Sequence, residues 1–474
     1  MKRPCSIAEA HREIAAGTLK PSQLLAECLR RIDRWEPQVH AWALVDRERA
    51  VAEAHRLDGL GHEQLAALPL AGVPLGIKDI FDVAGLPTRA GSPLSSTAPA
   101  AADAPCVARL RAAGAVIVGK TVTPEFAYID PPPTCNPWNL THTPGGSSSG
   151  SAAAVALGMC LGSIGSQTGG SIIRPAAYCG VAGFKPTFGR VDRTGVLVSS
   201  PTLDHVGPLA ASVTDLAVLW HVLADRRSEP PAQPAAESSP AHAEHASKWH
   251  HLFSWHHAEH KHSPEDPGFP QRAPRVAIVR EFLAEVSPEV LLVSEVTLGW
   301  LESHGAELVV AKLPAELNEI RAMHRTIMAF EMAGYHRQQY TAHRAQYGPL
   351  LSQLIEEGMA IDAGRYQSAK EHQHAFQSQL AAAFAGADAW VMPATTTTAP
   401  PRRDTTGDAR LNSVWSYAGA PALTLPCGVA TDNMPVGLQV VGRAGSDEAL
   451  LAIAAWCEQI IAFDGVPALA AEAD

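Results

Sequence analysis

The chain has 474 residues, of which 46% are hydrophobic and only 18% are charged. This composition excludes a disordered chain and supplies enough apolar side chains for a large core. The 48 acidic and 37 basic residues give a formal net charge of -11 at pH 7, and no long basic run is present to follow a phosphate backbone. Direct binding of nucleic acid is therefore not expected. The length fits either about three domains of roughly 150 residues or one large α/β unit.

The sequence carries no pattern for export or for membrane insertion. Two basic residues near the start are followed by alternating polar and apolar residues, and no apolar run reaches the roughly 18 residues of a membrane span. The eight cysteines are scattered and contain no CxxC pair, which is typical of reduced, buried thiols. These patterns predict a cytoplasmic protein that does not bind membranes.

The spacing of apolar residues predicts an N-terminal helical segment over residues 1–60, in which Gly17 and Pro21 separate two helices. Beyond it, apolar runs bounded by glycine alternate with short helices. One such helix is expected to end at Gly114, after which residues 115–118 form a buried strand. Strands that alternate with helices predict an α/β fold.

Residues 226–274 differ in composition from the rest of the chain, because proline, alanine, serine and histidine dominate them. They are predicted to form an insertion or linker. Pairs of histidines four or five residues apart could bind a metal ion on a helix, but no cysteine or carboxylate frame fixes a geometry. We therefore favour a solvated surface loop with incidental affinity for metal, and we assign no metal site. The eight histidines are His242, His245, His250, His251, His256, His257, His260 and His262.

Regular structure is expected to resume after this stretch, with strands, a helix at residues 290–305 and a further helical stretch. The final helix is predicted to begin at Ser446, whose hydroxyl would cap free amides, while Asp447 and Glu448 suit the positive end of the helix dipole. The strand candidates are residues 275–282, 307–313, 388–395, 421–429 and 435–443.

Two local patterns match known motifs in spacing but not in context. Residues 114–121, GAVIVGKT, fit a phosphate-binding loop, yet the interior residues are strand formers and Pro124 falls in the would-be helix. GSSSG at residues 146–150 fits the nucleophile elbow of α/β-hydrolases, with Ser148 as nucleophile. That elbow needs an apolar strand before it, whereas NPWNLTHTPG is typical of a loop. We therefore expect neither nucleotide binding nor a hydrolase elbow.

Three glycine-rich polar segments with apolar flanks make better sense together. They are GVPLGIKDIFDVAG around Lys78, TPGGSSSGSAAAVALG around Ser147 and GSQTGGSIIRPAAYCGVAGFKPTFGR around Ser171. Gly169 and Gly170 precede Ser171 and would free backbone amides to point at one oxygen atom, as an oxyanion site requires. Each segment alone is more simply a turn of serine and glycine, and Lys78 alone a surface ion pair.

Taken together, these segments resemble the amidase signature family, and the resemblance covers most of the chain. The upstream GKTVTPEFA and the downstream LDHVGPLA, TGDARLNSVWSYAGAPALTLPCG and MPVGLQVVGR complete a highly specific combination. The resemblance implies one large α/β domain over residues 1–474, with a mixed central β-sheet covered on both faces by α-helices. It also implies hydrolysis of an amide bond without a metal ion or organic cofactor.

The resemblance assigns a role to each of the prominent residues. Ser171 is similar to the family's nucleophile, Ser147 to the bridging serine that follows a cis peptide after Gly146, and Lys78 to the base. A lysine with its ordinary pKa of about 10.4 is charged at neutral pH, so it accepts a proton only if burial lowers that pKa by several units. A neutral Lys78 would draw a proton from Ser147 while Ser147 draws one from Ser171. The amides implied for the oxyanion site are those of Thr168, Gly169, Gly170 and Ser171.

The resemblance also implies supporting residues. Arg174 and Asp204 lie where members often have a buried ion pair, and Ser166 is either a hydrogen-bond partner near Lys78 or a simple turn hydroxyl. The chain departs from the common pattern at GGSSSG, where Ser149 adds a side chain, and at SIIRPA, which moves the arginine by one residue. None of the departures touches the three prominent residues.

The predicted function is hydrolysis of a carbon–nitrogen amide bond of a small molecule, through a Ser-cis-Ser-Lys triad and an acyl-enzyme intermediate. One alternative is the glutaminase subunit of a tRNA-dependent amidotransferase, although FEMAGYHRQQY at residues 330–340 differs from the segment expected of that subunit. A remoter alternative is a non-catalytic scaffold with the same fold.

The sequence does not identify the substrate. The acyl pocket is expected to be built from residues 120–138, 323–340 and 412–417, but one sequence does not aim their side chains. The role of residues 242–262 is left open, as are the formation of a homodimer and the need for a partner subunit.

Overall fold

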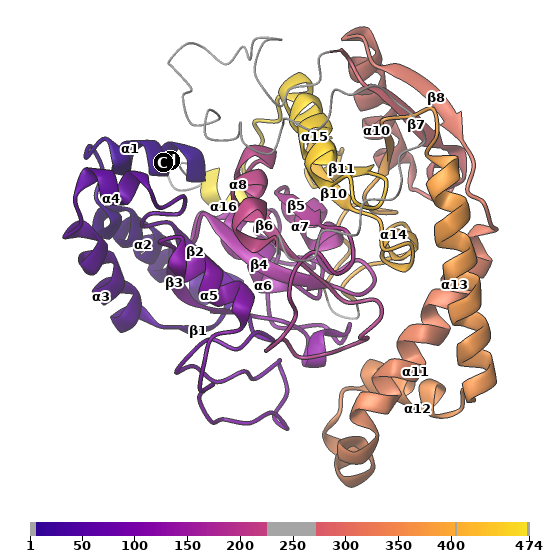
Figure 1. Cartoon of the computed structure of the whole chain (residues 1–474), viewed down its shortest axis with the longest axis horizontal. Helices are drawn as coiled ribbons and strands as arrows, with labels where there is room; N and C mark the ends of the chain where they lie inside the picture. Colours follow the sequence, from indigo (N-terminus) through magenta and orange to yellow (C-terminus); the bar gives the residue numbers. More distant parts are fainter. Residues whose placement is uncertain (1–5, 225–271, 403–404, 472–474) are drawn as a thin grey trace, which may run out of the picture.

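Eleven strands form one mixed sheet in this computed structural model, which describes residues 6–224, 272–402 and 405–471 (Figure 1). The strands are β1 Trp42–Val45, β2 Pro74–Lys78, β3 Val116–Thr121, β4 Gly162–Gln167, β5 Ala182–Lys185, β6 His205–Ala210, β7 Arg275–Val279, β8 Glu307–Ala311, β9 Ala389–Pro393, β10 Ala422–Val429 and β11 Pro435–Val441.

The sheet combines parallel and antiparallel neighbours. Its strand order is β1-β3-β2-β4-β6-β5-β10-β11-β9-β7-β8. β2 runs parallel to both β3 and β4, and β7 runs parallel to both β8 and β9, whereas the other pairs are antiparallel. The expected single α/β domain with a mixed sheet and packed helices is therefore confirmed, and the five strand candidates of the C-terminal half are all present as strands.

Helices connect these strands and pack against them. The described helices are α1 Ile7–Ala15, α2 Pro21–Val39, α3 Arg47–Asp58, α4 His62–Ala66, α5 Pro105–Ala112, α6 Ser149–Ala156, α7 Ile173–Cys179, α8 Val213–Leu223, α9 Arg280–Leu283, α10 Pro288–Ser303, α11 Leu317–His343, α12 Pro349–Met359, α13 Ala363–Ala383, α14 Ser413–Tyr417, α15 Asp447–Ile461 and α16 Ala468–Ala471, with short 3-10 turns at Glu125–Ala127 and Arg344–Gln346. Helices α11, α12 and α13 form the orange part of the molecule at the lower right of Figure 1.

The N-terminal segment differs from the prediction in one element. Gly17 has a φ of 74° and Pro21 is the first residue of α2, so the chain breaks between two helices where expected. However, residues 1–60 are not purely helical, because β1 lies within them and pairs antiparallel with β3 at the end of the sheet. The run Trp-Ala-Leu-Val was too short to separate from its helical flanks by periodicity alone.

The strands next to the catalytic candidates lie in the core. Every residue of β2, β3 and β4 is buried, which fits strands that are covered on both sides. Each aliphatic side chain buried here contributes about 1.5–3 kcal/mol relative to exposure. The lysine at the end of β2 is therefore held by a rigid, apolar frame.

The structure shows what is formed by the two segments that match known motifs only in spacing. β3 runs through Gly119 and Lys120, so GAVIVGKT is a strand, and the Lys120 ammonium is in a buried ion pair 2.8 Å from Asp79 Oδ1. A loop precedes Ser148, as expected, and α6 begins one residue later. Neither segment has the local structure that its motif requires.

The start of the last helix corrects a prediction. Ser446 does precede α15, but its hydroxyl makes no capping bond and instead donates to the Arg443 carbonyl at 2.7 Å. Asp447 is buried and accepts hydrogen bonds from the amide and hydroxyl of Thr187, at 2.7 and 2.6 Å. The first acidic residue of α15 therefore ties the helix to the loop after β5 rather than simply facing the helix dipole.

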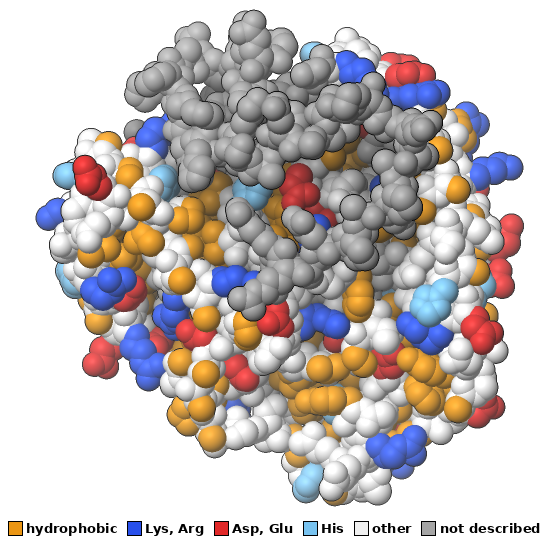
Figure 2. Space-filling view, viewed as in Figure 1, with side chains coloured by type: hydrophobic (Ala, Val, Ile, Leu, Met, Phe, Trp, Pro, Cys, Tyr) orange, Lys and Arg blue, Asp and Glu red, His pale blue; other side chains and the backbone are white. Residues whose placement is uncertain are grey.

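The remaining predictions concern the histidine-rich stretch, the membrane spans and the charge of the surface. Almost all of the histidine-rich stretch 226–274, including its eight histidines, lies outside the described residues. None of the helices in the described ranges is long and apolar enough to cross a membrane. On the face in Figure 2, basic and acidic side chains are interspersed, with no continuous basic tract among the residues shown in colour.

Candidate active site

The three prominent residues come from loops and strand ends that meet at one place. Lys78 is the last residue of β2, which is parallel to β4, so the carboxyl ends of both strands lie at the same edge. Ser171 follows β4 in the turn that leads into α7, and Ser147 lies just before α6. The amide of Ser148 donates to the Ser171 carbonyl at 3.2 Å, which joins the two serine segments.

Lys78 is fully buried, and its Nζ lies 2.8 Å from both Ser147 Oγ and Ser166 Oγ. Burial lowers the pKa of Lys78 to about 7, with the Asp204 carboxylate raising it and the Arg174 charge lowering it further. Two hydroxyls thus surround an amine that is close to half neutral at pH 7. The contact with Ser166 makes it a hydrogen-bond partner of the lysine rather than a simple turn hydroxyl.

Asp79 follows Lys78 directly, but its carboxylate is held elsewhere. Lys120 on β3 forms an ion pair with it at 2.8 Å, and the Arg89 amide donates to it at 3.3 Å. Since the hydrogen-bond partners of the Lys78 amine are serine hydroxyls, the adjacent carboxylate does not form an ion pair with this lysine. Lys120, which belongs to a segment expected to line the acyl pocket, instead has a structural position in the core.

The peptide bond between Gly146 and Ser147 is cis, as the resemblance implied. The Gly146 carbonyl accepts a hydrogen bond from Arg174 Nη2 at 2.6 Å, and the Gly145 carbonyl accepts one from Ser149 Oγ at 2.6 Å. Ser149, a departure from the common pattern, therefore fixes the loop through its added hydroxyl. These contacts orient the backbone that presents the Ser147 hydroxyl to the lysine.

The expected ion pair between Arg174 and Asp204 is wrong, because the two residues have separate partners. Besides the Gly146 carbonyl, Arg174 donates to the Gly407 carbonyl at 2.8 Å and to Thr406 Oγ1 at 3.2 Å. The Asp204 carboxylate accepts hydrogen bonds instead, from the hydroxyl of Thr168 at 2.6 Å and from the amides of Ser199 and Ser200 at 2.9 Å. From its position on α7, Arg174 therefore contacts the Ser147 loop rather than Asp204.

Ser171 is buried, with 8% of its surface exposed. In the described chain, its hydroxyl has no hydrogen bond to Ser147, so the structure joins Lys78 to Ser147 but not Ser147 to Ser171. Catalytic hydrogen bonds are often long before substrate binds. The second step of the proton relay thus stays a prediction.

The backbone before Ser171 has its carbonyls fixed by three different elements. The carbonyl of Thr168 faces His324 Nε2 at 3.0 Å, that of Gly169 accepts from Ser416 Oγ at 2.8 Å, and that of Gly170 accepts from the Arg174 amide at 2.9 Å. In a trans peptide the N–H points opposite to the C=O. The next amides in the chain, those of Gly169, Gly170 and Ser171, are therefore turned away from these partners, and none of them donates a hydrogen bond within the described chain. This is the arrangement that an oxyanion site requires.

Three of the residues that orient this loop were not singled out from the sequence. His324 is on α11 and Ser416 on α14, far from the nucleophile in sequence, while Gln167 lies within GSQTGGS next to the predicted oxyanion residues. Burial lowers the pKa of His324, so a neutral ring donates to the Thr168 carbonyl. No local signal distinguishes this histidine from the others. The segments 323–340 and 412–417, expected near the acyl group, do bring these two side chains to the site.

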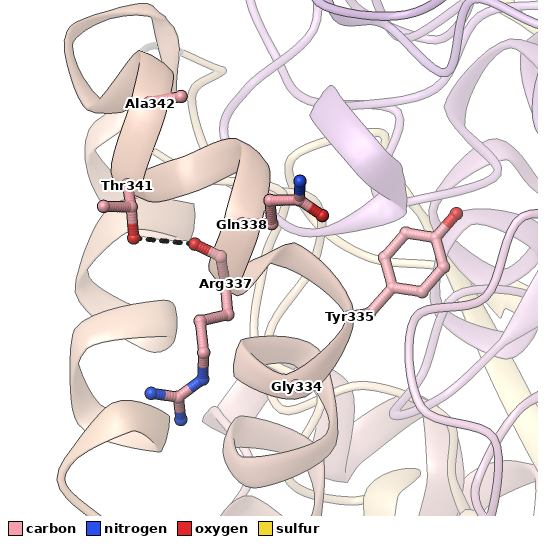
Figure 3. A pocket seen from close by; sticks show the side chains of 6 residues that line it. All are labelled: Gly334, Tyr335, Arg337, Gln338, Thr341 and Ala342. Carbon is pink, nitrogen blue, oxygen red and sulfur yellow. Dashed lines mark hydrogen bonds between the residues drawn. The ribbon is translucent and has the colours of Figure 1, made fainter.

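One surface depression of the described chain lies on α11. It has a volume of about 570 Å³ and is lined by Gly334, Tyr335, Arg337, Gln338, Thr341 and Ala342 of α11. Figure 3 shows the Tyr335 ring pointing away from the side chains of Arg337 and Thr341, whose hydroxyl donates to the Arg337 carbonyl at 2.8 Å. None of these residues forms a hydrogen bond with the side chains of Lys78, Ser147 or Ser171 in the described chain. Within the described residues, no group of three or more histidine, cysteine or acidic side chains could hold a metal ion.

The fold and this site define an amide-hydrolysing enzyme. The chain belongs to the Amidase family, whose profile matches residues 23–451. It is 32% identical to a glutamyl-tRNA(Gln) amidotransferase subunit of Chloroflexus aggregans, with 94% of each chain covered. A putative amidase of Mycobacterium tuberculosis is 33% identical, with 92% of this chain and 90% of the other covered. The relatives therefore include proteins named as parts of an amidotransferase and proteins named as amidases.

Solved structures give the same family. A crystal structure of an amidase has a TM-score of 0.80 at 32% identity, covering 96% of this chain and 99% of the other. The native peptide amidase of Stenotrophomonas maltophilia has a TM-score of 0.80 at 29% identity over 98% of both chains. The mixed sheet with its helices is therefore the amidase signature fold, while the particular amide is not distinguished by these similarities.

Proposed function

We propose that the chain hydrolyses the amide bond of a small molecule, with Ser171 as nucleophile, Ser147 as proton relay and Lys78 as base. The observation that carries the proposal is the fully buried Lys78 amine 2.8 Å from the Ser147 hydroxyl. The proposal is also supported by the backbone amides of Gly169, Gly170 and Ser171, whose N–H groups have no acceptor in the described chain. These two features support the assignment of a base, a relay and an oxyanion site to one place.

The proposed reaction has two steps, acylation of Ser171 and hydrolysis of the acyl-enzyme. Ser171 Oγ attacks the amide carbonyl while its proton passes to Ser147, and the Ser147 proton passes to Lys78. The oxyanion is stabilised by the amides of the loop, and the proton then returns through Ser147 to the leaving amine as the C–N bond breaks. Water attacks the acyl-enzyme along the same proton path, which releases a carboxylic acid and restores Ser171.

The proposal is tested with a panel of small carboxamides, anilides, urea-like compounds and peptide amides, assayed for release of ammonia or amine. Hydrolysis of at least one class, together with a covalent adduct at Ser171 from a fluorophosphonate probe, supports it. A protein that labels with the probe but turns over no amide would contradict the proposed reaction while leaving the nucleophile in place.

A second candidate is the glutaminase subunit of a tRNA-dependent amidotransferase, which the similarity to the Chloroflexus aggregans protein favours. Against it stands the different segment at residues 330–340. Glutamine hydrolysis measured alone and with the partner subunits of that system separates the two candidates. Activity on glutamine that appears only with the partners would favour the subunit over the free-standing amidase.

Ser147→Ala is expected to slow acylation by about 10²–10⁴-fold without abolishing it, because the relay is lost while the oxyanion amides and substrate binding remain. The change removes one hydroxyl from a buried position, so the fold is expected to persist. Single-turnover kinetics on the best amide measure the effect. Wild-type acylation by this variant would remove Ser147 from the proton path.

Turnover is expected to be independent of metal ions and of the histidine-rich stretch. The proposed base, relay and oxyanion site already fill the roles that a hydrolytic metal would fill. We therefore infer that residues 226–274 form a dispensable insertion. Dialysis against a strong chelator, or deletion of residues 228–270, is expected to leave the rate on the best amide within about twofold of wild type. Loss of activity on chelation that zinc restores would sink this prediction.

We also propose a cytoplasmic location and function without a partner subunit. Six buried cysteines form no disulfide within the described residues, which supports a reducing compartment; they are Cys106, Cys135, Cys160, Cys179, Cys427 and Cys457. Activity of the purified chain alone, in a reducing buffer, is the result that this proposal requires.

A further inference from the structure

We propose that Gln167 and Ser416 are positioning residues that fix the Gly169–Gly170 peptide plane, so that the Gly170 amide faces the oxyanion of the tetrahedral intermediate. This inference rests on the proposed function, because it concerns the same oxyanion site. Within the described residues, neither side chain forms a hydrogen bond with the side chains of the three catalytic candidates. Both act on the reaction through the backbone between them.

The first link is the hydroxyl of Ser416 on α14. It is buried, donates to the Gly169 carbonyl at 2.8 Å and accepts from Gln167 Nε2 at 3.2 Å. A serine hydroxyl has one hydrogen and two lone pairs. Because Gln167 supplies a donor to this oxygen, the single hydrogen of Ser416 is left for the Gly169 carbonyl.

The second link is the amide group of Gln167, the last residue of β4. Its Oε1 accepts hydrogen bonds from the amides of Ile172 and Ile173, at 2.9 and 3.0 Å. These N–H groups lie where α7 begins and have no intrahelical acceptor. With Oε1 committed to two donors, Nε2 must face Ser416, so the orientation of the Gln167 amide is settled by its partners.

The consequence falls on Gly170. Since the Gly169 carbonyl points at Ser416, the amide of Gly170 in the same planar peptide points the opposite way. Asn412, one turn before Ser416 at the start of α14, also lies against the loop, because a Cβ on Gly170 would lie 2.6 Å from Asn412 Oδ1. A larger residue at position 170 would therefore have to displace Asn412, so glycine lets the loop pack closely against α14.

A neutral side-chain amide at residue 167 also suits the negative charge that develops on the oxyanion. The oxyanion is negative, and a carboxylate at this position would repel it while donating nothing to Ser416. In a Gln167→Glu variant, Oε1 can still accept from the Ile172 and Ile173 amides, so the start of α7 is retained. The Ser416 hydroxyl, however, can then turn toward the carboxylate and release the Gly169 carbonyl.

The experiment compares Gln167→Glu and Ser416→Ala with wild type on the best amide substrate. Both variants are expected to lower kcat by about 10–100-fold with KM nearly unchanged, a smaller loss than deleting an oxyanion donor outright. The matching aldehyde, which forms a tetrahedral adduct with Ser171, is expected to bind more weakly by the same factor. The midpoint of the pH–rate profile is expected to stay at its wild-type value, because Lys78 is untouched. The double variant is expected to be no slower than the slower single variant.

The matched control is Ser294→Ala, which removes a buried hydroxyl on α10 that donates to the Val290 carbonyl at 2.7 Å. It is expected to retain wild-type kcat and aldehyde affinity. Folding of every variant is checked by thermal unfolding. If folded Gln167→Glu and Ser416→Ala both keep wild-type kcat and aldehyde affinity, the inference is wrong.

The labelling rate of Ser171 by a fluorophosphonate separates this inference from the proposed function. A wild-type protein that labels rapidly, with slower labelling in both variants, supports the positioning role even before a good amide is found. Equal labelling in all three proteins overturns the role of Gln167 and Ser416 but leaves the nucleophile intact. No labelling of wild type would instead remove the nucleophile on which both proposals stand.

Discussion

Ser171→Ala is expected to abolish acyl-enzyme formation and to lower turnover by roughly 10⁴-fold or more, because the attacking oxygen is lost and no other group in the site can replace it. The fold is expected to change little, since one hydroxyl is removed from a turn whose backbone is fixed by His324, Ser416 and the Arg174 amide. Intact mass spectrometry with a slowly hydrolysed amide is the measurement. Wild type is expected to accumulate an adduct, and the variant is expected to show none.

Ser148→Ala provides the matched control for this result. Ser148 is the neighbouring buried serine, but its Oγ lies 3.4 Å from both the backbone amide and the carbonyl of Ser166 rather than facing a substrate. The adduct is expected to form in this control as in wild type. An adduct that persists in Ser171→Ala and disappears in Ser148→Ala would move the nucleophile to Ser148.

The α/β class could be predicted from local patterns, whereas the buried lysine–serine pair was implied only by the resemblance of several segments taken together. Alternating apolar strands and helices indicated the α/β class, and glycine-rich segments with unusual serine content marked the loops at the strand ends. Lys78, Ser147 and Ser166 are brought together because β2 and β4 are parallel neighbours in the sheet. The strand order of the sheet, which no local pattern gives, therefore decides where the ends of these units meet.

The partners that orient the oxyanion loop could not be predicted, because they depend on the direction of single side chains from distant segments. His324 is 156 residues from Thr168, and Ser416 is 247 residues from Gly169. The wrong Arg174–Asp204 pair has the same origin. A shift of one residue on a helix turns a side chain by about 100°, so the sequence alone does not give the direction of the Arg174 side chain. In the structure the Arg174 side chain donates to the Gly146 carbonyl instead.

Local propensity also explains the smaller errors. Ser446 precedes a helix with acidic residues in its first turn, which is the usual sequence of an N-cap, yet its hydroxyl bonds to Arg443 in the preceding turn. Serine hydroxyls have several backbone partners within reach, and the choice among them depends on the entry angle of the chain. The sequence alone does not contain that angle.

Lys78 is expected to act as a neutral base, so the acylation rate should rise with pH through a midpoint near 7. Burial lowers the lysine pKa to about 7, which leaves the amine protonated and inactive below that pH and neutral above it. The rate is therefore expected to fall about tenfold per pH unit below the midpoint and to level off above about pH 8. Single-turnover acylation of the best amide, measured from pH 5 to 10, gives this profile. A profile that is flat from mildly acidic to alkaline pH would show that no such base is used.

Variants of Lys78 and Lys185 show which lysine sets the midpoint of the pH–rate profile. Lys78→Met keeps the length of the side chain without the amine, and Lys78→Arg keeps a positive charge that stays protonated, so both are expected to lose about 10³-fold or more in acylation. Lys185 is the matched control, because burial lowers its pKa to about 7 as well, but its Nζ donates to the carbonyls of Pro186 and Ala420. Lys185→Met is expected to reduce the free energy of unfolding while leaving the midpoint near 7. An active Lys78→Arg variant, or a midpoint that disappears with Lys185 instead of Lys78, would show that Lys78 is not the base.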